Sequence, residues 1–86
     1  MPTAPDSHDA YHYAERIRER LPRRLQELRE AAQLSKCALE KKSGVSREMI
    51  SCIKEGESVP TFHVGARLAY AVGVTLETFV EKLEDG

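Results

Sequence analysis

The stretch that decides the fold is Leu34–Thr61, which reads LSKCALEKKSGVSREMISCIKEGESVPT. Ser35 and Ser46 each precede a short run of helix-compatible residues, and serine is a preferred N-cap because its hydroxyl accepts a main-chain N–H at the start of a helix. Gly44 lies between the two runs, where a helix often ends in a left-handed conformation that strains any residue with a Cβ. The stretch therefore predicts two short helices joined by a tight turn. The predicted helices cover residues 36–43 and 47–54.

Helical periodicity divides the side chains of this stretch between two faces. The apolar residues expected between the helices are Leu39, Val45, Ile50 and Ile53, and the residues expected to face outward are Arg47, Glu48, Ser51 and Cys52. A tight turn sets the second helix across the first and lets it protrude. A protruding helix of this kind fits the major groove of DNA, which is about 12 Å wide.

The chain before this stretch also has helical periodicity. Pro22 divides it into a leading helix over 9–20 and a second helix over 22–32, because proline is tolerated at the first position of a helix. The alternative is that the two segments form one kinked rod. Residues 1–8 contain two prolines and almost no apolar mass, so we expect a disordered tail there.

The chain after this stretch predicts two more helices. Thr61 caps one that ends near Val72, and Thr75 caps a last helix that continues through Leu83. No segment alternates with a period of two, so no strand is predicted and the fold class is all-α. The core is expected around Leu25, Leu28, Leu39, Val45, Ile50, Ile53, Leu68, Val72 and Phe79.

Charge is distributed unevenly along the chain, although the net charge is only −1. Residues 16–54 carry eleven Lys and Arg against five Glu, whereas residues 1–15 carry a net −3 and residues 55–86 a net −4. This asymmetry favours one basic face directed at a polyanion and an acidic end directed away from it. Five arginines allow two interpretations: they extend this basic, phosphate-binding surface, or they form only a solvated face of a helix. They are Arg16, Arg18, Arg20, Arg23 and Arg24.

Several classes of protein do not fit the composition. The 86 residues support one domain with one core, and no apolar run reaches the ~20 residues of a membrane span. The start lacks the features of a signal peptide, so we expect a cytoplasmic protein without membrane association. Cys37 and Cys52 read as reduced thiols. His8 and His12 have the spacing of a metal pair but lack further ligands, and no catalytic constellation is present, so neither a metal, a cofactor nor an enzyme activity is predicted.

These residues together resemble the helix-turn-helix of the XRE family, which includes phage repressors, Cro proteins and many small bacterial regulators. The family pattern reads approximately L-S-Q-x-x-L-A-x-x-x-G-V-S-x-x-x-I-S-x-I-E-x-G-x-x-x-P. The chain matches it at Leu34, Ser35, Leu39, Gly44, Val45, Ser46, Ile50, Ser51, Ile53, Gly56 and Pro60. The resemblance implies a five-helix, lambda-repressor-like bundle with an additional N-terminal helix. The expected organisation is a tail over 1–8, a leading helix over 9–21 and a helix-turn-helix DNA-binding domain over 22–86.

The resemblance also implies roles for single residues. Arg47 and Glu48, at the start of the protruding helix, and Cys52, one turn later, would reach DNA bases, and Ser51 shares their face. Lys36 stands where the family usually has a phosphate-binding Gln. The phosphate contacts expected from the resemblance and from charge are Lys36, Ser46, Lys41, Lys42 and Lys54.

Three positions depart from the family pattern. Glu40 replaces a small Ala, and Lys54 replaces a Glu that usually pairs with the arginine corresponding to Arg29. We expect the two changes to compensate, with Glu40 reaching Arg29 or Lys54, because a buried charge needs a partner. Gly65 replaces a core Leu, and Phe62 or Ile17 is expected to fill the space.

The function implied by the resemblance is transcriptional control, as a repressor or autoregulator that binds a pseudo-palindromic DNA operator as a homodimer. The dimer contact is expected at the last helix, through Leu76, Phe79, Val80 and Leu83. The leading helix, through Tyr13 and Ile17, is the alternative. The competing function is a protein-interaction module, since antitoxins and adaptor proteins use the same fold to bind a partner protein.

Overall fold

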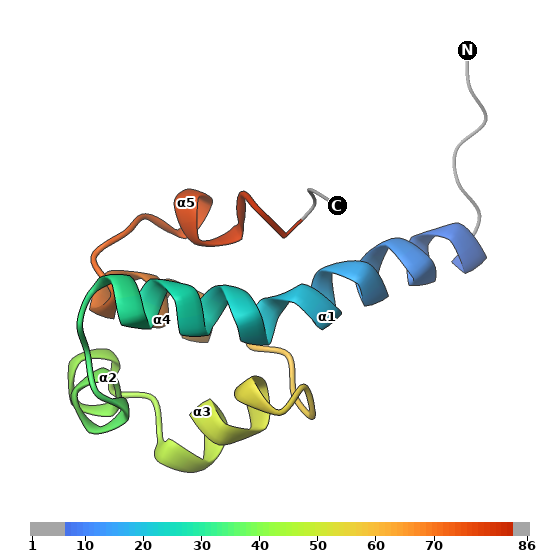
Figure 1. Ribbon diagram of the computed structural model, residues 1–86. Helices are drawn as coiled ribbons and strands as arrows, with labels where there is room; N and C mark the ends of the chain where they lie inside the picture. The colour runs from blue at the N-terminus through green and yellow to red at the C-terminus, as the bar shows by residue number, and fades with distance from the viewer. Residues whose placement is uncertain (1–6, 84–86) are drawn as a thin grey trace.

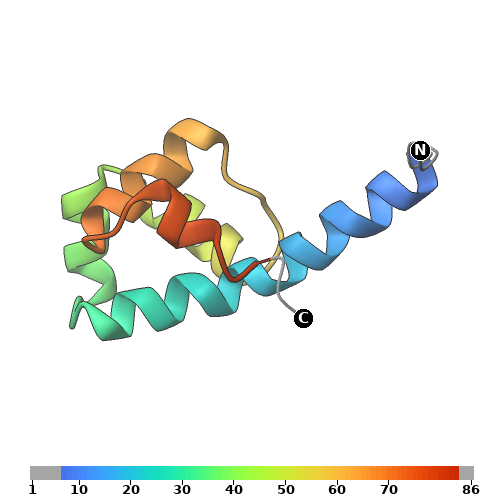
Figure 2. The same cartoon turned by 90° about the horizontal axis from the view of Figure 1, so that it is seen from above.

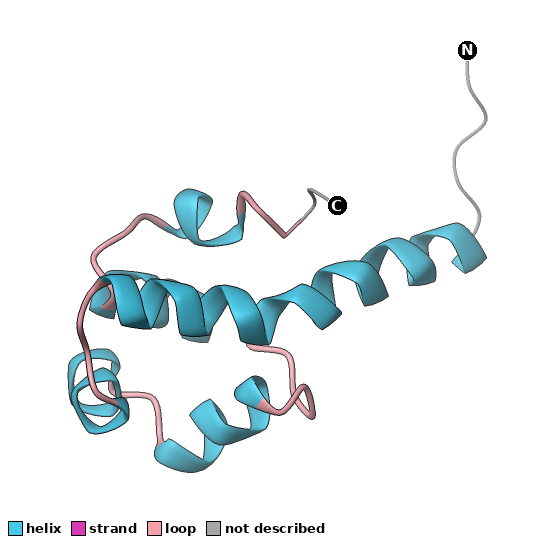
Figure 3. Ribbon diagram, in the orientation of Figure 1, coloured by secondary structure: helices cyan, strands magenta, loops and turns pink. Residues whose placement is uncertain are grey.

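The computed structural model describes residues 7–83, and within them all regular secondary structure is helical (Figure 3). In chain order the helices are α1 (Ser7–Ala31), α2 (Lys36–Ser43), α3 (Arg47–Lys54), α4 (Phe62–Ala71) and α5 (Leu76–Val80). The predicted all-α class is confirmed. Figure 1 shows the four shorter helices gathered around the C-terminal half of α1. None of the helices in this part of the chain has the length and apolar character needed to cross a membrane.

The four shorter helices begin where the sequence predicted because a hydroxyl caps each of them. The side chains of Ser35, Ser46, Thr61 and Thr75 accept hydrogen bonds from main-chain N–H groups three residues later, at 3.0, 3.2, 3.2 and 3.1 Å. Gly44 ends α2 in the predicted left-handed conformation, with φ 70°. The predicted bounds of α2 and α3 are confirmed residue by residue.

Helix α1 is continuous through Pro22, so the predicted division into helices over 9–20 and 22–32 is wrong and the alternative of a single rod holds. Proline removes one main-chain hydrogen bond from the interior of a helix. Packing offsets that loss, because Leu21 and Leu25 are both buried in the core on the face that α1 turns towards the other helices.

The N-terminal half of α1 projects away from the other helices (Figure 2). The helix begins at Ser7, so it takes in the end of the predicted tail, and residues 1–6 lie outside the described residues. Tyr11 and Tyr13 on the projecting half are 63 % and 44 % exposed. This half of α1 is therefore an arm with aromatic side chains in solvent.

The core lies between α1 and the shorter helices and is aliphatic except for one aromatic ring. Of the predicted core residues, Leu25, Leu39, Val45, Ile50, Ile53, Leu68, Val72 and Phe79 are buried, and Leu28 is partly buried against them. Gly65 is buried because α5 packs closely on α4 at this point, and a Cβ there would lie 3.6 Å from Leu76 Cδ1. Leu76 fills the space, and the expectation that Phe62 fills it is wrong, since Phe62 is 87 % exposed.

Helix α5 ends at Val80 rather than at the predicted Leu83. The buried guanidinium of Arg24 is the physical reason, because it donates to two carbonyl oxygens that a longer helix would use. Its Nε donates to the carbonyl of Phe79 at 3.0 Å, and its Nη2 donates to that of Thr78 at 2.6 Å. The chain then turns so that Leu83 is buried as well.

Two neighbouring arginines of α1 also donate to the main chain of distant segments. Arg18 Nη2 donates to the carbonyl of Gly56 at 3.0 Å, and Arg20 Nη1 donates to that of Leu83 at 2.9 Å. Three of the five arginines in the cluster, Arg18, Arg20 and Arg24, are therefore structural residues. They hold the loop after α3 and the C-terminal segment against α1.

Candidate nucleic-acid interface

The turn between α2 and α3 is held by hydrogen bonds within the turn and by hydrogen bonds from α4. Inside, the buried hydroxyl of Ser43 donates to the carbonyl of Leu39 at 2.7 Å and accepts from the N–H of Val45 at 3.1 Å. Outside, Arg67 of α4 donates through Nε to the carbonyl of Ser43 at 2.9 Å and through Nη2 to that of Gly44. These bonds set the direction in which α3 leaves the turn.

Arg67 is a functional residue that the sequence did not single out. It is one of only two basic residues in the acidic segment 55–86, so its isolation was the only available signal. Its role depends on α4 lying against the turn, and that packing comes from residues far apart in the sequence.

Helix α3 divides its side chains between the core and solvent as predicted. Ile50 and Ile53 are buried, whereas Arg47, Glu48 and Ser51 are exposed. Cys52 is half-buried, so it is the least accessible of the four predicted base contacts. Helix α3 therefore presents the polar side chains of Arg47, Glu48 and Ser51 to solvent.

Arg47 forms an ion pair with Glu40, which was predicted to pair with Arg29 or Lys54. The Nε of Arg47 lies 3.4 Å from Oε2 of Glu40. The predicted partner of Glu40 is therefore wrong. Arg29 instead donates to the carbonyl of Leu34 at 2.8 Å. Glu40 does have a cation beside it, but the cation belongs to the exposed face of α3.

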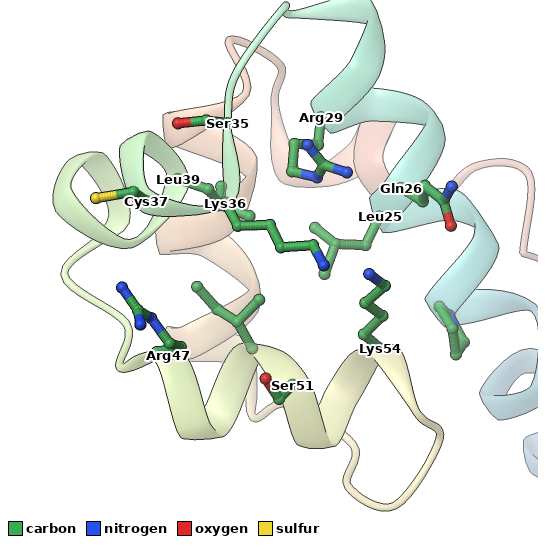
Figure 4. A pocket seen from close by; sticks show the side chains of 12 residues that line it. Leu25, Gln26, Arg29, Ser35, Lys36, Cys37, Leu39, Arg47, Ser51 and Lys54 are labelled. Atoms are coloured by element: carbon green, nitrogen blue, oxygen red, sulfur yellow. The ribbon is translucent and has the colours of Figure 1, made fainter.

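Three cations from three helices meet beside α3. Lys36 at the start of α2 and Lys54 at the end of α3 point towards one another, and the guanidinium of Arg29 on α1 points into the same space (Figure 4). The neighbouring amine of Lys36 is the main cause that lowers the pKa of Lys54 below the ordinary value of 10.5, through their side-chain interaction and their charge repulsion. Desolvation and the charge of Arg29 lower it further, and Glu55 opposes them.

The remaining predicted phosphate contacts lie on both sides of the turn. Lys41 and Lys42 are exposed on the last turn of α2. Ser46 is exposed, and its hydroxyl is already occupied as the cap of α3, which leaves its neighbouring N–H groups at the helix start. The structure thus brings Lys41, Lys42 and Ser46 to the edge from which α3 protrudes and places Lys36 and Lys54 in the separate cluster with Arg29.

The residues predicted as a dimer contact do not share one free surface. Phe79 is 1 % exposed and Leu83 is 4 % exposed, so both belong to the core of the single chain. Leu76 is half-buried against Gly65, and only Val80 is well exposed, at 41 %. The turn after α5 folds Leu83 inward, so these four residues do not form one exposed surface of the single chain.

The other candidate ligating residues are scattered. Cys37 and Cys52 are both free thiols, and Cys37 is exposed rather than packed. His8 and His12 lie close on the arm, with 3.1 Å between their Nε2 atoms. Among the described residues, no three His, Cys, Asp or Glu side chains come together to hold a metal.

Comparison with known families identifies this arrangement. Residues 20–81 match the family described as the helix-turn-helix domain, which covers more than half of the chain. The chain therefore belongs to the helix-turn-helix domain family. No curated protein and no solved structure gave a significant match.

Proposed function

We propose that this member of the helix-turn-helix family is a sequence-specific DNA-binding transcriptional regulator of the XRE type. It would act in the bacterial cytoplasm as a repressor or autoregulator, without enzyme activity. One observation carries the proposal: α3 presents Arg47, Glu48 and Ser51 to solvent, whereas Ile50 and Ile53 are buried and hold the helix on the core. A helix of this kind enters the major groove, where each base pair offers a distinct pattern of donors and acceptors.

Arg47 is the principal base contact in this proposal. A guanidinium donates two hydrogen bonds to guanine O6 and N7. The Glu40 pair does not prevent this, because exposed ion pairs are weak and the Arg47 side chain is 71 % exposed. Glu40 instead limits the positions that the free arginine takes up. Glu48 accepts from cytosine N4, Ser51 donates or accepts on the same face, and Cys52 contributes least because it is half-buried.

Sequence-independent attraction comes from the cations and N–H groups around α3. Lys41 and Lys42 are exposed on the last turn of α2, where each would attract a neighbouring phosphate of the duplex. The N–H groups after Ser46 add a second phosphate contact. Lys36 and Lys54 would add a second positive patch, together with Arg29, between α1, α2 and α3.

A homodimer on a pseudo-palindromic operator would place two recognition helices one helical turn apart, at ~34 Å. Because Phe79 and Leu83 are used in the core, we assign the dimer contact to the arm of α1. Tyr11 and Tyr13 there are exposed, and Ile17 is partly buried where the arm joins the body. Pairing of two arms would bury these side chains.

The test begins with selection of bound sequences from random duplex DNA, followed by fluorescence anisotropy on the selected duplex. Arg47→Ala should weaken binding by about 10- to 100-fold and relax the preference at one base pair. Arg23→Ala is the matched control, since Arg23 forms an exposed ion pair with Glu27 on α1, away from α3. It should change affinity by less than about twofold. Equal effects of the two variants, or no selected sequence, would contradict the proposal.

A partner protein is the second candidate, and a separate observation favours it. Phe62 and Tyr70 of α4 are 87 % and 78 % exposed, and neither is needed for the core. Exposed aromatic side chains are enriched in protein interfaces. Retention of DNA binding by a Phe62→Ser, Tyr70→Ser double variant, with loss of a co-purifying protein, would support an antitoxin or adaptor role in addition to DNA binding.

A further inference from the structure

A groove of about 540 Å³ opens between the C-terminal half of α1, the start of α2 and the face of α3 that carries Arg47, Ile50, Ser51 and Lys54. This volume falls within the range of small-molecule sites, roughly 300–1,000 Å³. Its apolar wall includes Leu25, Leu39 and Ile50, and its rim carries cationic side chains (Figure 4). No Asp or Glu is among the residues that line it. The groove therefore combines a hydrophobic wall with unbalanced positive charge.

The positive charge is concentrated at one end of the groove. Lys36 and Lys54 face one another there, and like charges at such short range repel. Arg29 uses Nη1 for the carbonyl of Leu34 and keeps its remaining N–H groups for another acceptor. Glu40, the carboxylate that would have relieved this repulsion, is engaged with Arg47 instead.

We propose that this groove binds a small phosphate ester, with its phosphate held by Arg29, Lys36 and Lys54 and its apolar or aromatic part against Pro22, Leu25 and Ile50. A phosphate monoester matches the site because it carries close to two negative charges and three strong acceptor oxygens. Guanidinium and ammonium groups from three helices supply the complementary donors. A simple carboxylate would neutralise only one of the three cations.

The wall next to the cations favours an ester over the free anion. Leu25 is 3 % exposed and Ile50 is 7 % exposed, so this wall belongs to the edge of the core, and half-buried Pro22 extends it towards solvent. A planar apolar group lying on it would remove further surface from water. If the chain binds DNA as proposed, such a ligand would compete for two of the lysines that attract the duplex, and the groove would regulate DNA binding.

The binding test uses the isolated chain and three probes: inorganic phosphate, adenosine 5′-monophosphate and adenosine. Amide chemical shifts followed by NMR during each titration give affinity and location. We expect adenosine 5′-monophosphate to bind most tightly, inorganic phosphate about tenfold more weakly and adenosine more weakly still. The shifted amides should belong to α1, α2 and α3 around the groove.

Lys54→Glu is the decisive variant, because the new carboxylate lies beside Lys36 and Arg29 and neutralises the site without removing apolar contacts. It should weaken binding of adenosine 5′-monophosphate by about tenfold or more. Lys82→Glu, the matched control, makes the same charge change at an exposed residue near the C-terminal end and should change affinity by less than about twofold. Thermal unfolding establishes that both variants are folded.

Three results would overturn the proposal: no saturable shift with any probe, equal weakening by Lys54→Glu and Lys82→Glu, or equal affinity for adenosine 5′-monophosphate and inorganic phosphate. A short duplex, titrated separately, distinguishes a DNA phosphate from a free ester. Binding of the duplex without the monophosphate overturns only the groove proposal. Binding of the monophosphate without any duplex overturns only the proposed function.

Discussion

Two basic regions of this chain differ in what their charges do. The arginines of α1 that lie near the body donate to main-chain carbonyls at Gly56, Thr78, Phe79 and Leu83. Beside α3, Lys36 and Lys54 face one another, Arg47 faces the exposed carboxylate of Glu40, and Arg29 gives only one N–H group to a carbonyl, that of Leu34. Both regions look alike in a count of charge along the sequence. The difference teaches that a cation whose N–H groups are taken up by main-chain carbonyls is structural, whereas a cation with N–H groups left over beside other cations is available to a ligand.

Arg24→Ala gives the largest expected effect and tests the structural half of this comparison. The variant removes two hydrogen bonds to carbonyls of α5 and leaves these acceptors beside a buried void. Charge-assisted bonds contribute about 1.5–3 kcal/mol each, so we expect the loss of two of them to lower the free energy of unfolding by about 3–6 kcal/mol. Urea denaturation followed by circular dichroism measures it.

Arg23→Ala is the control for Arg24→Ala, since its guanidinium lies on the exposed side of the same helix. It should change stability by less than about 0.5 kcal/mol. If both variants unfold at the same urea concentration, the arginines of α1 are not structural and the comparison fails.

Gly44→Ala comes next and tests how the turn before α3 is held. Gly44 has φ 70°, and a Cβ there would lie 2.6 Å from Arg67 Nη2, the group that bonds the turn. Backbone strain costs about 1–2 kcal/mol, and displacement of Arg67 adds to it. Gly56→Ala is matched, because Gly56 has φ 77° with nothing within 4 Å of its Cβ. Thermal unfolding should place Gly44→Ala below Gly56→Ala, and equal stabilities would exclude a role for Arg67.

Glu40→Gln has a smaller effect and concerns the ligand-binding half of the comparison. The Arg47–Glu40 pair is exposed, so stability should change by less than about 0.5 kcal/mol. Loss of the carboxylate removes repulsion of phosphate and releases Arg47. We therefore expect DNA affinity to rise by about two- to fivefold with weaker discrimination between sequences. Anisotropy on selected and unrelated duplexes measures both, and a fall in affinity would mean that Glu40 positions Arg47 for its base.

Local capping residues predicted the short helices, whereas packing between distant parts of the chain determined the course of α1 and the end of α5. Hydroxyl caps and Gly44 predicted α2 and α3 to the residue because caps act within three or four residues. Pro22 misled the same reasoning, because burial of Leu21 and Leu25 outweighs one missing hydrogen bond. The local sequence around Pro22 does not show that Leu21 and Leu25 are buried by helices from other parts of the chain.

The candidate site follows the same division. The exposed face of α3 was predictable, since it is the complement of buried Ile50 and Ile53. The partner of Glu40 and the contacts of Arg67 were not predictable, because Glu40 pairs with a side chain 7 residues away and Arg67 donates to a main-chain carbonyl 24 residues away. Phe79 and Leu83 were assigned to a dimer contact for a related reason, as an apolar stripe does not reveal whether the same chain or a second copy covers it.

The smallest expected effect is the pH dependence of Lys54. In the unfolded chain its amine has the ordinary pKa of 10.5, and in the folded chain the pKa is lower because of Lys36 and Arg29. Between the two values the unfolded chain binds more protons, so the free energy of unfolding rises with pH across that interval. Lys54→Gln removes the repulsion at every pH. It should therefore be more stable than the wild type at neutral pH, and the gap should close as the pH approaches 10.5. A gap that stays constant in urea titrations would show that Lys54 is not opposed by its neighbours, and the cations beside α3 would lose the feature that separates them from the arginines of α1.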